Sequence, residues 1–421
     1  MTTAPATYAY PIGLFGAFGI ELEYMIVDRE TLDVRPVCDE LFRAATGENV
    51  PDVEPDGENG VISWSNELAL HVVELKTQRP APSLDGLHTQ FQDHVRKVNT
   101  LLEPMDCRLL PTAMHPWMNP DTETRLWPHE NNEIYRTYDR IFGCKGHGWG
   151  NLQSTHINLP FANDEEFAKL HAALRLVLPI LPALAASSPI VEGKWSPISD
   201  YRMEVYRNNA KRVPMMNGLI VPEPVYSRTG YERDILGRLY DQLAPLDPEG
   251  VLRYEFANAR GAMARFDRGA IEIRVLDIQE CPLADIAVAA FVVEVVKALV
   301  DERWQSTEAQ RATKTEPLYE VLLDTIRYAE RTRVTHREIL DAFGFTRSLV
   351  WAGDIWARLL EDVMPDHPVY TPVLRRLLRA GTLATRIARD IRRFPTRTEL
   401  QEIYAELARC LDEGTLFRAP E

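Results

Sequence analysis

The sequence predicts a mixed α+β fold in which a sheet-containing part is followed by a helical part. Between residues 10 and 280, strand-like stretches alternate with helical ones, and most of the Gly and Pro punctuation falls there. The rest of the chain is almost continuously helical in pattern, with helices expected at 285–304, 316–331, 336–342, 347–363, 370–393 and 397–412. We therefore expect one domain over residues 1–300 and a helical region over 301–421 that packs onto it.

Length, composition and charge narrow the class of protein. The chain has 421 residues, of which 45% are hydrophobic and 26% are charged, so it can bury a large core. It carries 47 Lys and Arg against 62 Asp and Glu, and this balance argues against nucleic acid as a partner. No stretch has the composition of a membrane span or of a signal peptide. Five cysteines without a CxxC pair favour a cytoplasmic protein.

The negative charge is concentrated in the first part of the chain. Residues 301–421 contain 19 basic and 20 acidic residues, which leaves 28 basic and 42 acidic residues in 1–300. Like charges destabilise a compact state unless something offsets them, and bound cations are the simplest offset. Acids spread over a solvated surface would need no such offset, and charge alone leaves both explanations open.

A segment near the N-terminus places two carboxylates on one face of a predicted strand. Residues 19–28 alternate with a period of two, so Ile20 and Leu22 lie on an apolar face. Glu21 and Glu23 lie on the opposite face. Because a strand half exposed to solvent would tolerate both acids, this segment alone does not define a site.

Two further acids, Glu67 and Glu74, flank an apolar run. Glu74 lies between Val73 and Leu75, where an unpaired carboxylate would be costly. The two acids are seven positions apart, so one straight strand would point them to opposite faces. They can share a site only if a bend, a bulge or a hairpin falls between them.

Two more predicted strands carry polar side chains on one face. One of them places His156 beside Asn158, although a lone histidine is more often a structural residue than a ligand. The other, at 269–277, places Glu272 beside Arg274. A glutamate followed two residues later by an arginine can present a metal ligand and a fixed cation to one phosphate. An ordinary ion pair worth under about 1 kcal/mol is the alternative.

Together these segments supply five carboxylates and one imidazole from apolar strands. That number and type of ligand suit two oxygen-preferring divalent ions whose shells are completed by nucleotide phosphates. Several other catalytic signatures are absent from the sequence, which has no GxxxxGK[ST] loop, no HExxH and no GxSxG. A P-loop is therefore not expected to hold the phosphates.

The order of these segments resembles the glutamate–cysteine ligase family, and most closely its second family, the bacterial carboxylate–amine ligases. The resemblance spans roughly residues 15–300 and includes the stretches 184–190 and 200–202. Its main elements are Glu21-Leu22-Glu23, then Glu67, Glu74 and Thr77, then Thr155-His156-Ile157-Asn158, and finally Glu272-Ile273-Arg274-Val275-Leu276-Asp277. It implies a glutamine synthetase-like catalytic fold, an antiparallel sheet flanked by helices, with metals and ATP on its concave face.

The resemblance also implies roles for individual residues. The implied ligands of two ions, Mg²⁺ or Mn²⁺, form two sets of three: Glu23, Glu67 and Glu74, and Glu21, His156 and Glu272. Arg274 would face the γ-phosphate of ATP and act with Glu272 in catalysis. Arg202, Arg207 and Asn158 are the implied candidates for binding substrate.

The implied activity is ATP-dependent joining of a carboxylate to an amine, as in glutathione biosynthesis. The γ-carboxylate of glutamate would form an acyl phosphate, from which an amine, expected to be cysteine, displaces phosphate. A ligase with a different amine acceptor, a guanidino-kinase-like phosphotransferase and a nucleotide-binding protein without turnover are alternatives. The expected partners are these small molecules, with no nucleic acid and no membrane, and a homo-oligomer is left open.

One arginine-rich segment is not accounted for by this activity. Its arginines are opposed in the local sequence only by Asp390, and they are Arg375, Arg376, Arg379, Arg386, Arg389, Arg392, Arg393 and Arg397. The segment could form a lid that attracts an anionic substrate or nucleotide. A solvated helix face that pairs with the acidic body is the more common arrangement for such a pattern.

Overall fold

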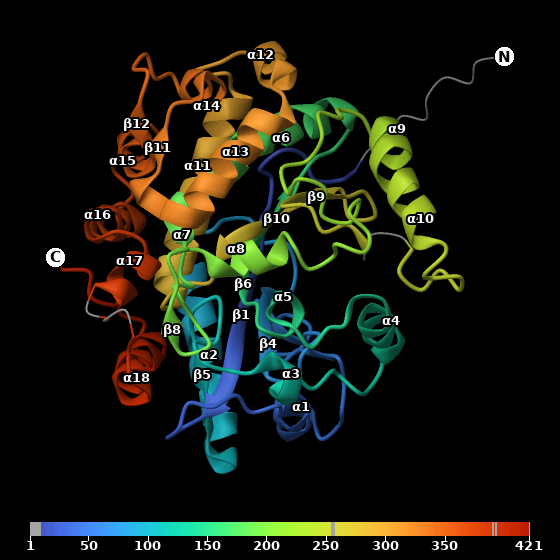
Figure 1. The fold of residues 1–421 in the computed structure, drawn as a ribbon, viewed down its shortest axis with the longest axis vertical. Helices are drawn as coiled ribbons and strands as arrows, with labels where there is room; N and C mark the ends of the chain where they lie inside the picture. The colour runs from blue at the N-terminus through green and yellow to red at the C-terminus, as the bar shows by residue number, and fades with distance from the viewer. Residues whose placement is uncertain (1–9, 254–256, 390, 392–393, 421) are drawn as a thin grey trace.

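The computed structural model describes residues 10–253, 257–389, 391 and 394–420. Within these residues, an eight-stranded antiparallel sheet runs through the middle of the molecule (Figure 1). Its order is β2-β3-β4-β1-β6-β10-β9, and β5 pairs with the second half of β1. The strands of this sheet are β1 (Gly19–Asp28), β2 (Asp52–Val53), β3 (Ile62–Asn66), β4 (Val72–Thr77), β5 (Cys107–Leu110), β6 (Ser154–Pro160), β9 (Ala262–Arg265) and β10 (Ala270–Asp277).

Two short hairpins and a series of helices complete the fold. The hairpins are β7 (Ile190–Val191) with β8 (Lys194–Trp195), and β11 (Arg333–Val334) with β12 (Val350–Trp351). The helices of the first 300 residues are α1 (Cys38–Thr46), α2 (Leu87–Leu102), α3 (Pro120–Glu123), α4 (Asn132–Phe142), α5 (His147–Gly150), α6 (Asp164–Val177), α7 (Pro182–Ala185), α8 (Tyr201–Tyr206), α9 (Arg228–Tyr231), α10 (Arg238–Leu243) and α11 (Pro282–Val300). Those that follow are α12 (Thr307–Ala312), α13 (Thr315–Tyr328), α14 (Arg337–Ala342), α15 (Ala352–Val363), α16 (Tyr370–Ala380), α17 (Leu383–Ala388) and α18 (Arg397–Glu413).

One face of the sheet is apolar and forms the main core. Ile20 and Leu22 on β1, Ile157 on β6, and Ile271 and Ile273 on β10 are fully buried. The helices α2, α6 and α11 pack together in the same core, and α2 also contacts β3 and β5. Full burial of an Ile or Leu side chain contributes about 2 kcal/mol, so this face holds the sheet against the helices. The opposite face is left for polar side chains.

The period-two alternation locates the long strands closely. The predicted strand at 19–28 is β1, and the strand predicted at 269–277 differs from β10 by one residue. The segment at 153–160 becomes β6. The segment 66–77 contains the last residue of β3, a turn and β4, and β3 itself begins earlier, at Ile62. The mixed α+β fold with a large antiparallel sheet and C-terminal helices is thus confirmed.

Two of the predicted C-terminal helices are wrong in extent. The helix expected at 370–393 is broken into α16 and α17, because Gly381 has a positive φ of 87° and the Thr382 side chain caps α17. Its residues 390, 392 and 393 lie outside the described part of the chain. The helix expected at 347–363 begins only at Ala352, because the two residues before it pair with β11. The helix α12 is not predicted at all.

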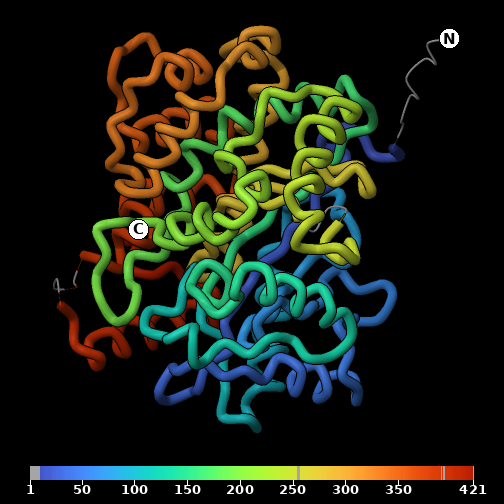
Figure 2. The backbone as a smooth tube through the Cα atoms, turned by 45° about the vertical axis from the view of Figure 1, so that its right-hand side comes forward, coloured from blue at the N-terminus to red at the C-terminus, as the bar shows by residue number. Residues whose placement is uncertain are grey.

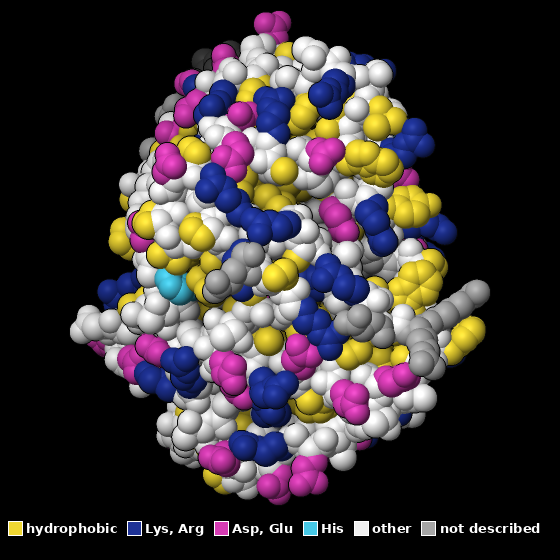
Figure 3. Space-filling model, turned by 90° about the vertical axis from the view of Figure 1, so that its left-hand side faces the viewer, with side chains coloured by type: hydrophobic (Ala, Val, Ile, Leu, Met, Phe, Trp, Pro, Cys, Tyr) yellow, Lys and Arg dark blue, Asp and Glu magenta, His cyan; other side chains and the backbone are white. Residues whose placement is uncertain are grey.

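The arginine-rich segment is paired with acids from distant parts of the chain. Arg375 forms an exposed ion pair with Glu361, and Arg397 pairs with Asp33. Figure 3 looks onto this side of the molecule and shows basic and acidic side chains interspersed over it. Acids outside the segment therefore oppose these arginines. The exposed pairs of Arg375 and Arg397 favour a solvated helix face, whereas Arg386 is buried. Asp390, Arg392 and Arg393 lie outside the described residues.

The C-terminal helices pack against the first part of the chain. Gln92 of α2 donates from its amide to the Leu411 carbonyl at 2.7 Å, and Arg108 of β5 pairs with Asp412. Figures 1 and 2 both show this segment lying along one side of the body. All five cysteines are buried and unpaired. None of the helices in the described residues combines the length and apolarity that crossing a membrane requires.

The deepest link between the two parts is the ion pair of Arg386 and Glu280. Both side chains are almost completely buried, and Arg386 also donates to the Phe417 carbonyl at 2.6 Å. Arg386→Met leaves a buried carboxylate without its partner, so we expect the free energy of unfolding to fall by about 3–5 kcal/mol. Urea unfolding measures it. Arg375→Met, at an exposed pair, should cost under about 1 kcal/mol, and equal losses in both variants would contradict this assignment.

A buried histidine makes stability depend on pH. His115 Nε2 lies 2.7 Å from the Leu32 carbonyl, and its Nδ1 accepts from the Met118 amide at 3.0 Å. Burial lowers the pKa of His115 from 6.5 to about 3. The unfolded chain therefore binds a proton below pH 6.5 that the folded chain excludes, and between pH 7 and pH 5 this group alone should remove about 2 kcal/mol of stability. Urea unfolding at the two pH values should show a weaker pH dependence in His115→Gln than in the wild type.

Candidate active site

A hairpin brings Glu67 and Glu74 to the same side of the sheet. The chain leaves β3 at Asn66, turns, and returns as β4 from Val72. Glu67 follows the end of β3, so the odd spacing of the two acids no longer sends them to opposite faces. In the adjoining pair of strands, Glu74 lies directly opposite Glu23 of β1. Two carboxylates that face each other across neighbouring strands repel, so both need compensating partners.

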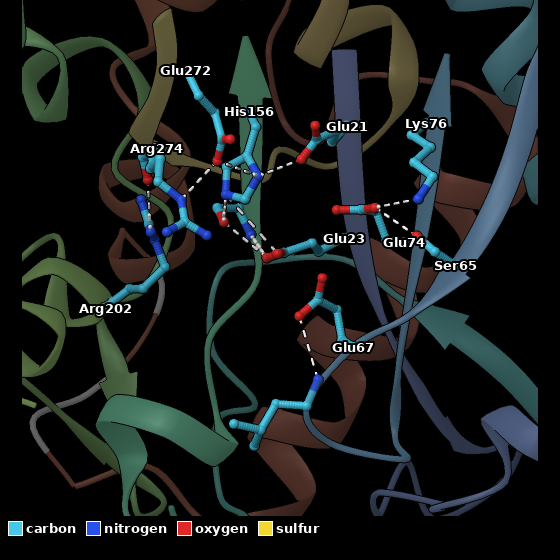
Figure 4. Close-up of polar contacts among 12 residues, drawn as sticks. Glu21, Glu23, Ser65, Glu67, Glu74, Lys76, His156, Arg202, Glu272 and Arg274 are labelled. Atoms are coloured by element: carbon cyan, nitrogen blue, oxygen red, sulfur yellow. Dashed lines mark hydrogen bonds and ion pairs between the residues drawn. The ribbon is translucent and has the colours of Figure 1, made fainter. Parts of the chain in front are cut away.

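The acids predicted from separate segments line one cavity. It has a volume of about 830 Å³ and lies over the polar face of the sheet. Figure 4 shows these side chains directed from different strands toward a common region around the imidazole. The six that line it are Glu21, Glu23, Glu67, Glu74, His156 and Glu272. The structure therefore brings all six predicted residues together.

His156 lies at the centre of this acidic cluster. Its Nδ1 is 2.8 Å from Glu21 Oε2 and 3.8 Å from Glu272 Oε1, and its Nε2 is 4.0 Å from Glu23 Oε1. Burial alone would lower the pKa of His156, but the hydrogen bond to Glu21 and the charges of Glu23 and Glu21 raise it to about 9. The same contact lowers the pKa of Glu21 against the effect of burial. In this structure the imidazolium thus serves as a central positive charge.

Hydrogen bonds hold one oxygen of each of two carboxylates. Asn158 donates from Nδ2 to Glu21 Oε1 at 2.9 Å. Ser154 donates to Glu23 Oε2 from both its backbone nitrogen, at 2.6 Å, and its hydroxyl, at 2.8 Å. These contacts fix the carboxylates, and Glu23 Oε1 remains on the side of His156. Asn158 lines the cavity as predicted for a substrate-binding residue, but its amide nitrogen is bonded to Glu21.

On the β4 side of the cluster, Glu74 and Glu67 have raised pKa values. Ser65 donates its hydroxyl to Glu74 Oε1 at 2.6 Å, and Lys76 Nζ lies 3.5 Å from the same oxygen. Burial and the charge of Glu21 nevertheless hold the pKa of Glu74 well above its usual range. Burial and the charge of Glu23 raise the pKa of Glu67 to about 7. Burial, together with the neighbouring carboxylates, thus disfavours the charged forms of Glu67 and Glu74, and Lys76 offsets this only in part.

A glutamate and two arginines close the β10 side. Arg274 Nε lies 2.9 Å from Glu272 Oε1, and Arg265 Nη1 lies 3.4 Å from Glu272 Oε2. The ion pair keeps the Arg274 guanidinium beside the acidic cluster (Figure 4), although its Nε has no hydrogen-bond partner among the described residues. Such a fixed guanidinium suits a phosphate group, because its planar N–H donors match phosphate oxygens.

Two overlapping groups of side chains could hold a divalent cation. Their ligand atoms lie within 4.8 Å of one another in each group, which are Glu21, His156 and Glu272, and Glu23, Glu74 and His156. The first group is the predicted set. In the second, His156 takes the place that the prediction gives to Glu67, which lines the same cavity without belonging to either close group in the described residues.

The two arginines expected to bind substrate have different surroundings. Arg202 lines the cavity and is 1% exposed, with its Nε paired to Asp277 and its Nη1 donating to the Arg274 carbonyl. Its Nη2 has no partner among the described residues. Arg207 is not part of the described cavity lining, since its guanidinium is paired with Glu204 at 2.8 and 2.9 Å. The expectation for Arg207 is therefore not supported.

Sequence reasoning missed several residues of this site. Lys76 follows Glu74 by two positions on the same strand, so the period-two alternation could have found it. Ser65 pairs with Glu74 across the β3–β4 register, and Arg265 reaches Glu272 from β9. Nothing in the local sequence marks these two, because their proximity arises only from strand pairing.

Comparison with solved structures identifies the fold. A glutamate–cysteine ligase from Francisella tularensis in complex with AMP superposes with a TM-score of 0.57 at 14% identity, covering 98% of this chain and 91% of that one. A bifunctional glutathione synthetase from Pasteurella multocida gives a TM-score of 0.56 at 15% identity, over 95% of this chain and 52% of that one. The protein has the glutamine synthetase-like fold of these ligases.

Sequence comparison gives the family. The model of glutamate–cysteine ligase family 2 matches residues 17–406. An uncharacterized protein from Archaeoglobus fulgidus is 32% identical over 400 residues, which cover 95% of this chain and 99% of that protein. The chain belongs to glutamate–cysteine ligase family 2, and it is a ligase.

The buried carboxylate of Glu67 should lower the free energy of unfolding at alkaline pH. The pKa of Glu67 rises from 4.5 to about 7 on folding, so the folded chain retains a proton that the unfolded chain loses between these pH values. Stability therefore falls as pH rises through this window, and the ionised Glu67 opposes folding at pH 8. Glu67→Gln should then raise the free energy of unfolding by about 1–3 kcal/mol in metal-free buffer. Urea unfolding with a chelator present checks this.

An exposed glutamate supplies the matched control for this substitution. Glu48 lies on the surface, so Glu48→Gln should change stability by no more than about 0.5 kcal/mol. A Glu67→Gln protein that is no more stable than the wild type would show that burial and the charge of Glu23 do not destabilise this carboxylate.

Proposed function

We propose that the protein is an ATP-dependent carboxylate–amine ligase that forms a γ-glutamyl amide through an acyl phosphate. The observation that carries this proposal is the acidic cluster around His156, which shares one cavity with the guanidinium of Arg274. Family membership supports the reaction class. Glutamate is the acid we propose, and cysteine, the amine in the family's name, is the reference amine for the test.

The reaction needs ATP because a carboxylate has no good leaving group. An oxygen of the γ-carboxylate attacks the γ-phosphorus of ATP, and the bond between that phosphorus and the ADP oxygen breaks. The amine nitrogen then attacks the acyl carbon, the bond from that carbon to the phosphate oxygen breaks, and phosphate and a proton are released. Both reactants of the first step are anions. Catalysis of this step therefore depends mainly on aligning the carboxylate with the γ-phosphate and on neutralising their negative charge.

The donor set fits Mg²⁺ or Mn²⁺. Carboxylate oxygens with a single imidazole suit these hard cations, and the raised pKa values of Glu67 and Glu74 reflect a need for positive charge. The proposed ligands are Glu21, His156 and Glu272 for one ion, and Glu23 and Glu74, with Glu67 nearby, for the other. His156 would have to release its proton to bind an ion. When bound, such ions would offset the repulsion between a triphosphate and a carboxylate.

Arg274 is the residue we assign to the transferring phosphoryl group. Glu272 holds its guanidinium in place at 2.9 Å, so little reorganisation is needed when charge moves toward it. Charge stabilisation of this kind is worth about 3 kcal/mol or more in phosphoryl-transfer sites. Arg202, with one unpartnered nitrogen in the cavity wall, is the proposed partner of the α-carboxylate of glutamate.

Substitutions at β10 test the proposal. Glu272→Gln and Arg274→Ala should each lower kcat by roughly a hundredfold or more, because they remove a proposed metal ligand and the phosphoryl-facing cation. The assay is phosphate release from ATP with Mg²⁺, glutamate and an amine, with mass spectrometry of the product. The wild type should give a γ-glutamyl amide.

Arg207→Ala is the matched control, since Arg207 lies outside the cavity lining and pairs with Glu204. It should leave the rate close to that of the wild type. Wild-type rates in both β10 variants would refute the assigned roles. A phosphorylated amine without any amide would instead identify a guanidino-kinase-like phosphotransferase.

A further inference from the structure

The register of the sheet gives the cavity two distinct ends. Gly19 of β1 lies opposite Asn158 of β6, and Ala270 of β10 lies opposite Pro160, so these residues mark one end. At this end the lining includes four basic side chains, which we call the basic end: Lys76, Arg79, Arg265 and Arg268. A polyphosphate bound here would face Arg79 and three cations that are also paired with Asp52 or Asp267.

The opposite end lies where β6 begins, and its wall is aromatic. We call it the aromatic end, and its lining includes Tyr135, Tyr138, Trp149, Leu152 and Tyr206. The rings of Tyr138 and Trp149 have centroids 5.2 Å apart. Tyr206 lies on α8 one turn after Arg202, whose Nη1 donates to the Arg274 carbonyl at 3.2 Å. Tyr138 lines the same cavity as these residues.

The polar atoms of this wall are largely used within the protein. Trp149 donates from Nε1 to the Asn209 carbonyl at 3.1 Å, and Tyr206 donates its hydroxyl to the Ala259 carbonyl at 2.9 Å. The Tyr135 hydroxyl accepts from Asn66 Nδ2 at 3.0 Å. What these side chains offer to a ligand is therefore mainly ring surface, which binds apolar groups and attracts an alkylammonium ion.

The cations at the aromatic end are too few for two carboxylates. In the described lining of this end, the arginines are Arg202 and Arg274, and the charge of His156 is already paired with Glu21. Arg274 is held by Glu272 and assigned to the phosphoryl group. Arg202 has a single unpartnered nitrogen, and the α-carboxylate of the acid substrate takes it. A second carboxylate, on the amine substrate, would be desolvated among aromatic rings without a positive partner, which is unfavourable.

We propose that the amine substrate is a primary amine with an apolar body and no carboxylate. This inference rests on the proposed ligase function and specifies the chemical class of its second substrate. The apolar body lies against the aromatic end, while the amine nitrogen points toward the acyl carbon near Arg274. Cysteine and other amino acids fit less well, because each brings a carboxylate to an end that has no cation left for it.

Three matched amines separate the features on which this depends. 2-Phenylethylamine has the apolar body and no carboxylate, L-phenylalanine adds the carboxylate, and ethylamine lacks the body. With the full-length wild type, glutamate, ATP and Mg²⁺, we expect kcat/KM for 2-phenylethylamine to exceed that for phenylalanine, ethylamine and cysteine by at least about tenfold. Mass spectrometry should identify the γ-glutamyl amide.

The outcomes distinguish this inference from the function on which it rests. If cysteine or phenylalanine is used as well as 2-phenylethylamine or better, the inference is overturned while the ligase stands. If ethylamine matches 2-phenylethylamine, the aromatic end does not select the amine and the inference is likewise overturned. If no amine yields an amide and glutamate does not stimulate phosphate release, the ligase proposal itself fails.

Substitutions at Tyr135 test the location. This side chain is only partly buried, so its truncation should leave the core intact. Tyr135→Ala should raise KM for 2-phenylethylamine about tenfold and leave KM for ATP and glutamate unchanged, whereas Tyr135→Phe, which keeps the ring, should behave like the wild type. An equal rise in KM for glutamate would assign this ring to the acid site, and an unchanged amine KM in Tyr135→Ala would also contradict the proposal.

Discussion

Repulsion among carboxylates gathered on one face of a sheet is the constraint that organises this molecule. Glu23 and Glu74 lie directly opposite each other on neighbouring strands, where like charges destabilise pairing. Internal cations reduce the repulsion, with His156 at the centre and Lys76 beside Glu74. Glu21, Glu23 and Glu74 each accept a hydrogen bond at one oxygen from a side-chain or backbone donor. These hydrogen bonds orient the carboxylates. An arrangement that is so unfavourable for folding suits a site that receives positively charged ligands.

Much of this site can be predicted from the sequence, because strand alternation is a local property. The period of two assigns Glu21 and Glu272 to the polar faces of their strands without any knowledge of the partners. What sequence cannot supply is register: the contact of Ser65 with Glu74 depends on which residues of two strands face each other. Arg207 lies outside the described cavity lining for a related reason. It follows Arg202 by five positions, which on a helix points the two side chains in different directions.

The C-terminal helices show a second limit of prediction from nearby residues in the sequence. Within residues 375–397 the sequence contains a single acid, Asp390, against eight arginines. In the fold, Arg375 pairs with Glu361, which lies 14 residues before it and outside the arginine-rich segment, and Arg397 pairs with Asp33, which lies 364 residues away. The break at Gly381 is different in kind, because a glycine followed by a capping threonine is a recognisable stop and start signal. The helix is nevertheless predicted to continue through Gly381, because the apolar residues keep a helical period on both sides of it.

The buried ion pair of Arg386 and Glu280 connects the C-terminal helices to the wall of the active-site cavity. Glu280 lies three residues beyond Asp277, the residue that holds Arg202 in the cavity wall. A chain that ends before α17 would keep Glu280 but lose Arg386, the only cationic partner of Glu280 in the described residues. The charge of Glu280 would then be uncompensated, close to the end of β10 that holds Arg202. A minimal version of this enzyme therefore cannot be made by deleting the C-terminal helices alone. A shorter relative would need an uncharged residue at this position or a cation supplied from elsewhere.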